Sequence, residues 1–235
     1  MTGRRPSRWQ RLLRDERGIS LVELIVAMTL SVLVLTIAGS FLISTQRASV
    51  TASAVNENTR TAAAAMNEMT RVMRSATDNP VSTGDDPQYA FQYASATSVR
   101  FFTYVNTSST ASQPVQVQLS LDTTRGTITE TKWSGTVVPY SDYFTFPMST
   151  GATLSTTPTS TRTLVNSVVS ANAFTFYNAA GGIIAPSGGS ISATDLPNIR
   201  KVTVTVTTGT STSDPRATTL TNSVNLPNIV MGASS

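Results

Sequence analysis

The stretch RDERGISLVELIVAMTLSVLVLTIAGSFLI, residues 14–43, decides how the N-terminal part of this chain folds. From Ile19 to Ile43 it is predominantly apolar, and Glu23 is its only charged residue. As an α-helix these 25 residues would extend about 37 Å, enough to cross a hydrocarbon core of about 30 Å. A carboxylate inside a bilayer costs up to about 3 kcal/mol at its centre and usually has a function. Glu23 therefore sets this run apart from a plain membrane anchor.

The positive charge of the chain is confined to the segment before this run. Residues 1–18 contain six arginines and two acidic residues, which accounts for the whole net charge of +4. The arginines are Arg4, Arg5, Arg8, Arg11, Arg14 and Arg17. The positive-inside rule then predicts a cytoplasmic leader and an external C-terminal region. Because the rest of the chain is neutral overall, the basic pI does not indicate a nucleic-acid partner.

The composition also argues against catalysis. The chain has no histidine and no cysteine, which removes the common general base, the common zinc ligands and any disulfide. Only Lys132 and Lys201 are present for a serine–lysine mechanism, and no Ser-x-x-Lys motif accompanies them. Asp85, Asp86 and Asp142 are candidate calcium ligands, but they lack ligand spacing and are better read as solvated loop carboxylates. We expect no enzyme activity, no cofactor and no metal.

The apolar run has three interpretations. It is too long for a secretory signal peptide and lacks a small-residue cleavage site. A simple signal anchor explains the length but leaves Glu23 unexplained. The third interpretation comes from the residues around the leader. Gly18 ends the basic leader, hydrophobic Ile19 follows, and Glu23 is the fifth residue after Gly18.

This arrangement resembles the type IV prepilin signal of pilins and pseudopilins, although many members begin with Phe where this chain has Ile19. The resemblance implies cleavage between Gly18 and Ile19 by a membrane prepilin peptidase and N-methylation of Ile19. It further implies that Glu23 pairs with the N-terminal amine of a neighbouring subunit during filament assembly. The implied partners are the peptidase, other pilin or pseudopilin subunits and the membrane.

The helical pattern continues beyond the apolar run. Apolar positions such as Val55, Met66 and Met73 recur at helical spacing among charged residues, and Glu68 with Arg71 forms an i,i+3 pair. The sequence Asp78-Asn79-Pro80 ends the pattern. One helix from Ile19 to about Ala76 is predicted, about 85 Å long. Its methionines are expected to pack against a sheet rather than to bind a cofactor.

From residue 78 onward the chain is rich in Ser and Thr and shows alternation of period two, typical of half-buried antiparallel strands. Valines, leucines and other apolar residues should face the core while Thr and Gln face solvent. The predicted strands are 89–94, 98–105, 115–122, 126–133, 173–178, 200–208 and 217–226. The pattern of residues 162–170 is compatible with a strand or with a short helix. DTTRG (122–126) predicts a hairpin turn. Residues 134–161 predict a surface loop.

The C-terminal strands resemble, more loosely, W-type minor pilins and the J-type pseudopilin of type II secretion. The matching residues are Phe174, Phe176, Tyr177, Ile199, Arg200, Val202, Leu226 and Asn228. Pro227-Asn228 stands where that group has Arg-Asn, which puts the subtype in doubt.

Together these patterns predict an α+β, pilin-like fold in four parts: leader 1–18, transmembrane or assembly helix 19–43, amphipathic helix 44–77 and antiparallel β ectodomain 78–235. The resemblance implies a minor pilin or pseudopilin that helps to initiate or cap a filament. It would lie in the cytoplasmic membrane and then in an extracellular or periplasmic filament. Two alternatives stay open: a pilus-tip adhesin or DNA-uptake subunit, and a membrane-anchored ectodomain outside any filament.

Overall fold

The structure, a computed structural model, describes residues 20–81, 88–104 and 113–229. A helix, α1 (Leu21–Arg74), precedes all the strands. The strands are β1 (Phe91–Ala94), β2 (Ser98–Thr103), β3 (Val115–Asp122), β4 (Thr127–Ser134), β5 (Thr136–Val137), β6 (Phe144–Thr145), β7 (Ser160–Val165), β8 (Phe174–Tyr177), β9 (Ile183–Ile184), β10 (Lys201–Thr208) and β11 (Thr218–Asn225). A 3-10 turn, η2 (Leu196–Asn198), precedes β10.

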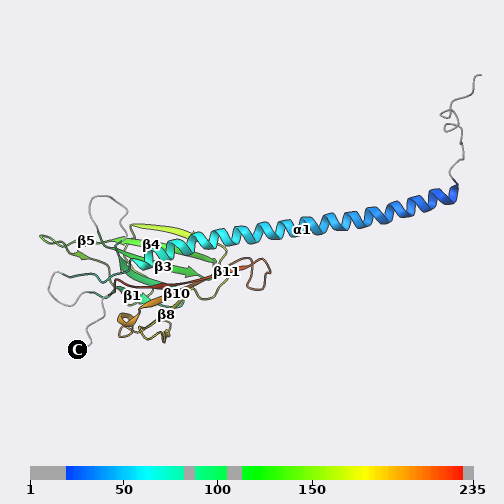
Figure 1. The fold of residues 1–235 in the computed structure, drawn as a ribbon. Coiled ribbons are helices and arrows are strands. Elements are labelled where there is room, and N and C mark those ends of the chain that lie inside the picture. Colours follow the sequence, from blue (N-terminus) through cyan, green and yellow to red (C-terminus); the bar gives the residue numbers. More distant parts are fainter. Residues whose placement is uncertain (1–19, 82–87, 105–112, 230–235) are drawn as a thin grey trace, which may run out of the picture. The chain divides into compact units, whose positions relative to one another are not determined.

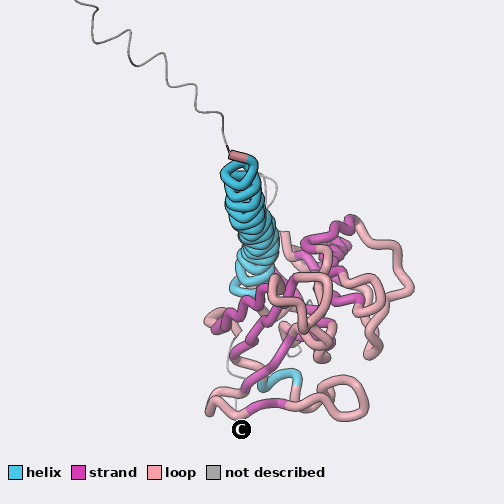
Figure 2. The backbone as a smooth tube through the Cα atoms, turned by 90° about the vertical axis from the view of Figure 1, so that its right-hand side faces the viewer, coloured by secondary structure: helices cyan, strands magenta, loops and turns pink. Residues whose placement is uncertain are grey.

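Helix α1 confirms the predicted single long helix. It contains 54 residues, Gly39 among them, and Figure 2 shows it as one unbroken helix. The chain divides into two compact units, residues 1–51 and 52–235, and α1 contributes to both. In the first unit the large apolar side chains are exposed, for example Leu21 and Phe41, each 74% exposed. Such a surface needs lipid or other helices to cover it.

The strands of the second unit form two main sheets (Figure 1). One has the order β1-β2-β3-β4-β7, the other β11-β10-β8-β9, and every strand pair is antiparallel. The α+β fold class, with the helix packed on antiparallel sheet, is therefore confirmed. Residues 160–165 form β7, so the open question about residues 162–170 resolves to a strand at its start.

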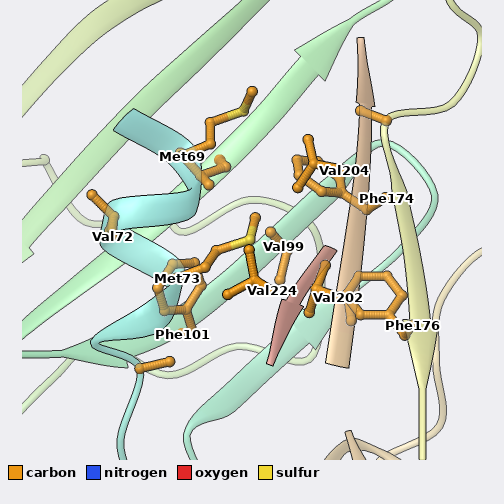
Figure 3. Packing of buried hydrophobic residues seen from close by; sticks show 14 of the residues in the cluster. Met69, Val72, Met73, Val99, Phe101, Phe174, Phe176, Val202, Val204 and Val224 are labelled. Atoms are coloured by element: carbon orange, nitrogen blue, oxygen red, sulfur yellow. The ribbon is translucent and has the colours of Figure 1, made fainter. Parts of the chain in front are cut away.

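One hydrophobic core joins the last turns of α1 to both sheets. Met69, Val72 and Met73 are fully buried in this core, and Figure 3 shows Met73 close to Val99 of β2 and Val224 of β11, one strand from each sheet. Burying a methionine or valine contributes about 1.5–3 kcal/mol. The prediction that the methionines serve packing is confirmed, and this contact fixes the helix end on the sheets.

The strands follow the predicted alternation in one sheet and depart from it in the other. In β10, Val202, Val204 and Val206 are buried on one face, as the sequence indicates. In the five-stranded sheet the expectation that glutamines face solvent is wrong, because Gln116 and Gln118 of β3 are buried. Both faces of that sheet are covered.

The second cover comes from residues 146–159, here called the strap. The Phe146 ring packs against the Phe102 ring of β2 in a tilted arrangement, with ring centroids 5.0 Å apart. Gln118 Nε2 donates to the carbonyl of Ala152 at 2.7 Å, and Trp133 Nε1 donates to that of Thr156 at 3.1 Å. The segment 134–161 thus contains the small β5–β6 hairpin and a strap bound to the sheet, instead of only a surface loop.

The predicted turn at DTTRG is confirmed between β3 and β4. The Asp122 carboxylate accepts hydrogen bonds from the backbone N–H groups of Thr124 and Arg125, at 2.9 and 3.0 Å. Gly126 has φ +64°, and a Cβ there would lie 2.8 Å from the carbonyl oxygen of Val168. Only glycine fits both conditions.

Candidate functional site

Glu23 lies in the first turn of α1, two residues after Leu21, where the helix begins. Near this end the Leu24 N–H donates to the Ser20 carbonyl, at 3.0 Å. The leading N–H groups of a helix have no partners within it, and the helix dipole favours negative charge there. Within the described residues, Glu23 forms no ion pair.

Four hydroxyl groups of the apolar run are satisfied inside the helix. Thr29, Ser31, Thr36 and Ser40 each donate a hydroxyl hydrogen bond to a backbone carbonyl three or four residues earlier, at 2.7–2.9 Å. Their polarity therefore costs little in an apolar environment. Glu23 is the only charged residue of the run, and its neighbours Val22 and Leu24 are exposed apolar residues. Once lipid or other helices cover this surface, the Glu23 carboxylate lies in an apolar environment and needs a partner from outside its own helix turn. The predicted cleavage residues, Gly18 and Ile19, lie outside the described residues.

A charge network holds α1 on the five-stranded sheet, and the sequence predicted only one part of it, the pair of Glu68 with Arg71. Glu68 of α1 accepts hydrogen bonds from Arg71 Nε and Nη2, at 2.9 and 2.7 Å, and also pairs with Arg162 of β7. Arg162 Nε donates to Glu130 of β4, and Lys132 Nζ lies 3.2 Å from the same carboxylate. The Glu130 side chain has no exposed area. The only hint in the sequence is its position two residues after Ile128, in phase with the apolar face of β4.

This network makes the stability of the second unit depend on pH. The hydrogen bonds from Arg71, reinforced by Arg162 against partial burial, lower the pKa of Glu68 from its ordinary value of 4.5 to about 2. Between about pH 2 and 4.5 the Glu68 carboxylate is therefore ionised in the folded protein but mostly protonated in the unfolded chain, and this difference favours folding. The resulting stabilisation is complete above about pH 4.5 and disappears as the pH falls toward 2.

We expect the free energy of unfolding of the full chain to fall between about pH 4.5 and 2, and to fall less in Glu68→Gln. The measurement is denaturant unfolding of both proteins in micelles at several pH values, followed by Trp133 fluorescence in a Trp9→Phe background. Comparing the two proteins removes the contribution of Asp214, whose pKa is also lowered by its hydrogen bonds from Arg216 and Thr210. Parallel curves for the two proteins would contradict the role of Glu68.

The residues of the weaker C-terminal resemblance come together in space. Phe176 of β8 lies opposite Val202 of β10, and the Leu226 N–H donates to the carbonyl of Arg200 at 3.0 Å. Asn228 Nδ2 donates to the carbonyl of Arg74 at 3.3 Å, in the last turn of α1. The C-terminal strands thus bind the end of the helix.

The remaining sequence candidates do not assemble into a site. Lys132 pairs with Glu130, and Lys201 Nζ lies 4.1 Å above the Tyr177 ring. Asp142 is in the turn between β5 and β6, while Asp85 and Asp86 fall outside the described residues. Across the described ranges no group of three or more Asp, Glu, His or Cys residues could hold a metal ion.

Comparison with known proteins adds one positive finding. Residues 13–39 match the family model described as the prokaryotic N-terminal methylation motif. No curated protein matches the chain. By length and composition, α1 is the one helix among the described residues able to cross a membrane. The match includes Gly18, Ile19 and Glu23, and it shows that this chain carries a type IV pilin-like prepilin signal.

Proposed function

We propose that this protein is a minor pilin or pseudopilin, a structural subunit of a type IV pilus-like filament. The observation that carries the proposal is the prepilin signal joined directly to a helix whose apolar side chains are exposed, with Glu23 in its first turn. A helix with such a surface is stable in lipid, and equally among sister helices in a filament. A structural subunit needs no catalytic group.

Each residue of the signal has a physical task in this proposal. Cleavage after Gly18 removes all the leader arginines and creates a new amine on Ile19, which is then methylated. The Glu23 carboxylate of one subunit pairs with the Ile19 amine of its neighbour. Because an opposite charge nearby offsets the cost of a carboxylate in an apolar environment, the pair favours assembly in register.

The parts of the chain follow from the same proposal. Residues 1–18 form the cleaved cytoplasmic leader, 19–43 the membrane and assembly segment, 44–77 the amphipathic helix, and 78–235 the ectodomain outside the cytoplasm. In the filament, sister helices replace lipid around residues 19–43. The prepilin peptidase and other pilin subunits are the expected partners.

The finer proposal is a W-type or J-type subunit that initiates or caps assembly. It is supported by the contacts among Phe176, Val202, Arg200 and Leu226 and by the bond from Asn228 to the helix end. These residues occupy the positions on which the resemblance rests. Pro227 remains a departure from the pattern of that group.

The proposal predicts a defined new N-terminus. When the chain is co-expressed with a prepilin peptidase, we expect mass spectrometry to find a mature protein that begins at Ile19 and carries one methyl group. Without the peptidase, or with Gly18→Val, the leader should remain. A chain that keeps Arg4 to Gly18 in the presence of active peptidase would overturn the proposal and leave a plain membrane anchor.

A further inference from the structure

A groove of about 540 Å³ opens in the second unit beside β1. Its three walls are the segment around β1 (Tyr89 to Tyr93), the start of the strap (Met148 to Thr150) and a third segment made of Ser190 to Ala193 and Leu196. Its volume lies within the range of small-molecule sites, which are about 300–1,000 Å³. It is separate from Glu23 and from the charge network of Glu68 and Glu130.

The walls are held in place by buried contacts. Arg100 of β2 is fully buried, and its guanidinium donates to the carbonyls of Ser149 and Gly151 and, at 3.3 Å, to Gln118 Oε1. A buried guanidinium is costly unless it is well hydrogen-bonded, so here it fixes the wall of the strap. The third wall is joined to β1 by a bond from the Ile191 N–H to the Ala94 carbonyl, at 2.8 Å. The groove therefore exists before any ligand arrives.

The lining combines aromatic and neutral polar groups. Its apolar part includes Tyr89 and Met148, which are 43% and 51% exposed. Its polar side chains are Gln92, Ser149, Thr150, Ser190 and Ser192. Gln92 donates its amide to the Tyr89 carbonyl at 2.5 Å, which leaves its Oε1 as an acceptor. Among the described residues that line the groove, none is Asp, Glu, Lys or Arg.

These features select a ligand by its chemistry. A charged ligand would lose its hydration without gaining an opposite charge from the described lining. A purely apolar ligand would offer no hydrogen bond to Gln92 Oε1 or to the remaining valences of the lining hydroxyls, and each polar group buried unsatisfied costs about 1–3 kcal/mol. A neutral sugar ring has an apolar face for a tyrosine ring and a rim of hydroxyls for the polar side chains.

We propose that this groove binds a neutral saccharide, with the Tyr89 ring against one sugar face and Gln92 hydrogen-bonded to its hydroxyls. The proposal goes beyond filament assembly and does not depend on it. Binding is a property of the second unit, so it persists even if the leader is never cleaved.

The test uses the full chain in phospholipid nanodiscs, because alkyl glycoside detergents carry neutral sugar headgroups that would occupy the groove. The probes are oligosaccharides of glucose, galactose and N-acetylglucosamine, alongside sialylated and sulfated oligosaccharides. Saturation-transfer NMR and titration measure binding. We expect at least one neutral sugar to bind with a Kd below about 1 mM, and Tyr89→Ala and Gln92→Ala each to weaken it at least about tenfold.

The matched control is Tyr140→Ala, because Tyr140 is a fully exposed tyrosine on the β5–β6 turn and does not line the groove. It should leave the affinity unchanged. Trp133 fluorescence in a Trp9→Phe background checks that each variant is folded. The proposal is overturned if no neutral sugar binds at about 10 mM, if only acidic sugars bind, or if folded Tyr89→Ala binds as tightly as wild type.

Discussion

The variant Glu23→Ala is expected to reach the membrane but to enter filaments at least about tenfold less than the wild-type chain. Removing the carboxylate makes the apolar run more compatible with lipid, while the subunit loses the charge proposed to attract the Ile19 amine of its neighbour. A tenfold change corresponds to about 1.4 kcal/mol, which is modest for an ion pair in an apolar environment. The measurement is the fraction of chain recovered in sheared filaments from cells that contain the assembly machinery.

Two controls separate pairing from general damage. Glu57→Ala removes another glutamate from α1, outside the apolar run, and should assemble normally. Mass spectrometry of Glu23→Ala reports whether its leader is still removed, which distinguishes a defect in processing from one in assembly. Normal assembly of Glu23→Ala would refute the proposed pairing with the Ile19 amine.

The second large effect is expected from Arg162→Met, which should lower the free energy of unfolding of the second unit by about 2–4 kcal/mol. Arg162 bridges Glu68 of α1 and Glu130 of β4, and the Glu130 side chain is fully buried. Deleting one partner of a buried ion pair costs about 3–5 kcal/mol, because the remaining charge is left uncompensated. Lys132, 3.2 Å from Glu130, and the partial exposure of Arg162 reduce that cost.

The double variant Arg162→Met with Glu130→Met should recover much of the loss, because it removes the buried charge together with its partner. Arg125→Met is the matched control: Arg125 is 82% exposed and lies 3.9 Å from Asp122, so its loss should cost less than about 1 kcal/mol. Denaturant unfolding of the full chain in micelles, followed by Trp133 fluorescence with Trp9→Phe, measures all four proteins. Equal destabilisation by Arg162→Met and Arg125→Met would show that the network contributes no more to the free energy of unfolding than an exposed ion pair does.

The sequence predicts well those elements whose structure is decided by residues close together in the chain. The long helix follows from a continuous apolar run and an amphipathic continuation. Strand β10 follows from strict alternation, with Val202, Val204 and Val206 on one face. The hairpin at Asp122 follows from its turn residues. For the helix and the strand, the period of the sequence matches the period of the structure.

The strap shows where this reasoning fails. Residues 146–159 are rich in Ser, Thr and Pro and carry no periodic signal. They lie over the five-stranded sheet because Arg100, Gln118 and Trp133 donate hydrogen bonds to their backbone carbonyls. Backbone carbonyls are present at every residue, so no sequence pattern marks the ones that will be used. For the same reason the period-two pattern predicts a solvent-facing Gln118, while the structure buries it under the strap.

The sequence by itself determined the prepilin signal, the helix that follows it and the antiparallel character of the C-terminal region, because each depends on residue type and short spacing. Only the tertiary structure decided the pairing of Glu68 and Glu130 with Arg162, the position of the strap on the five-stranded sheet and the groove beside β1. These features join residues far apart in the chain; Glu68 and Arg162, for example, are 94 positions apart. Such contacts form where the sheet topology brings distant segments together, and no local pattern along the chain specifies which residues will be in contact.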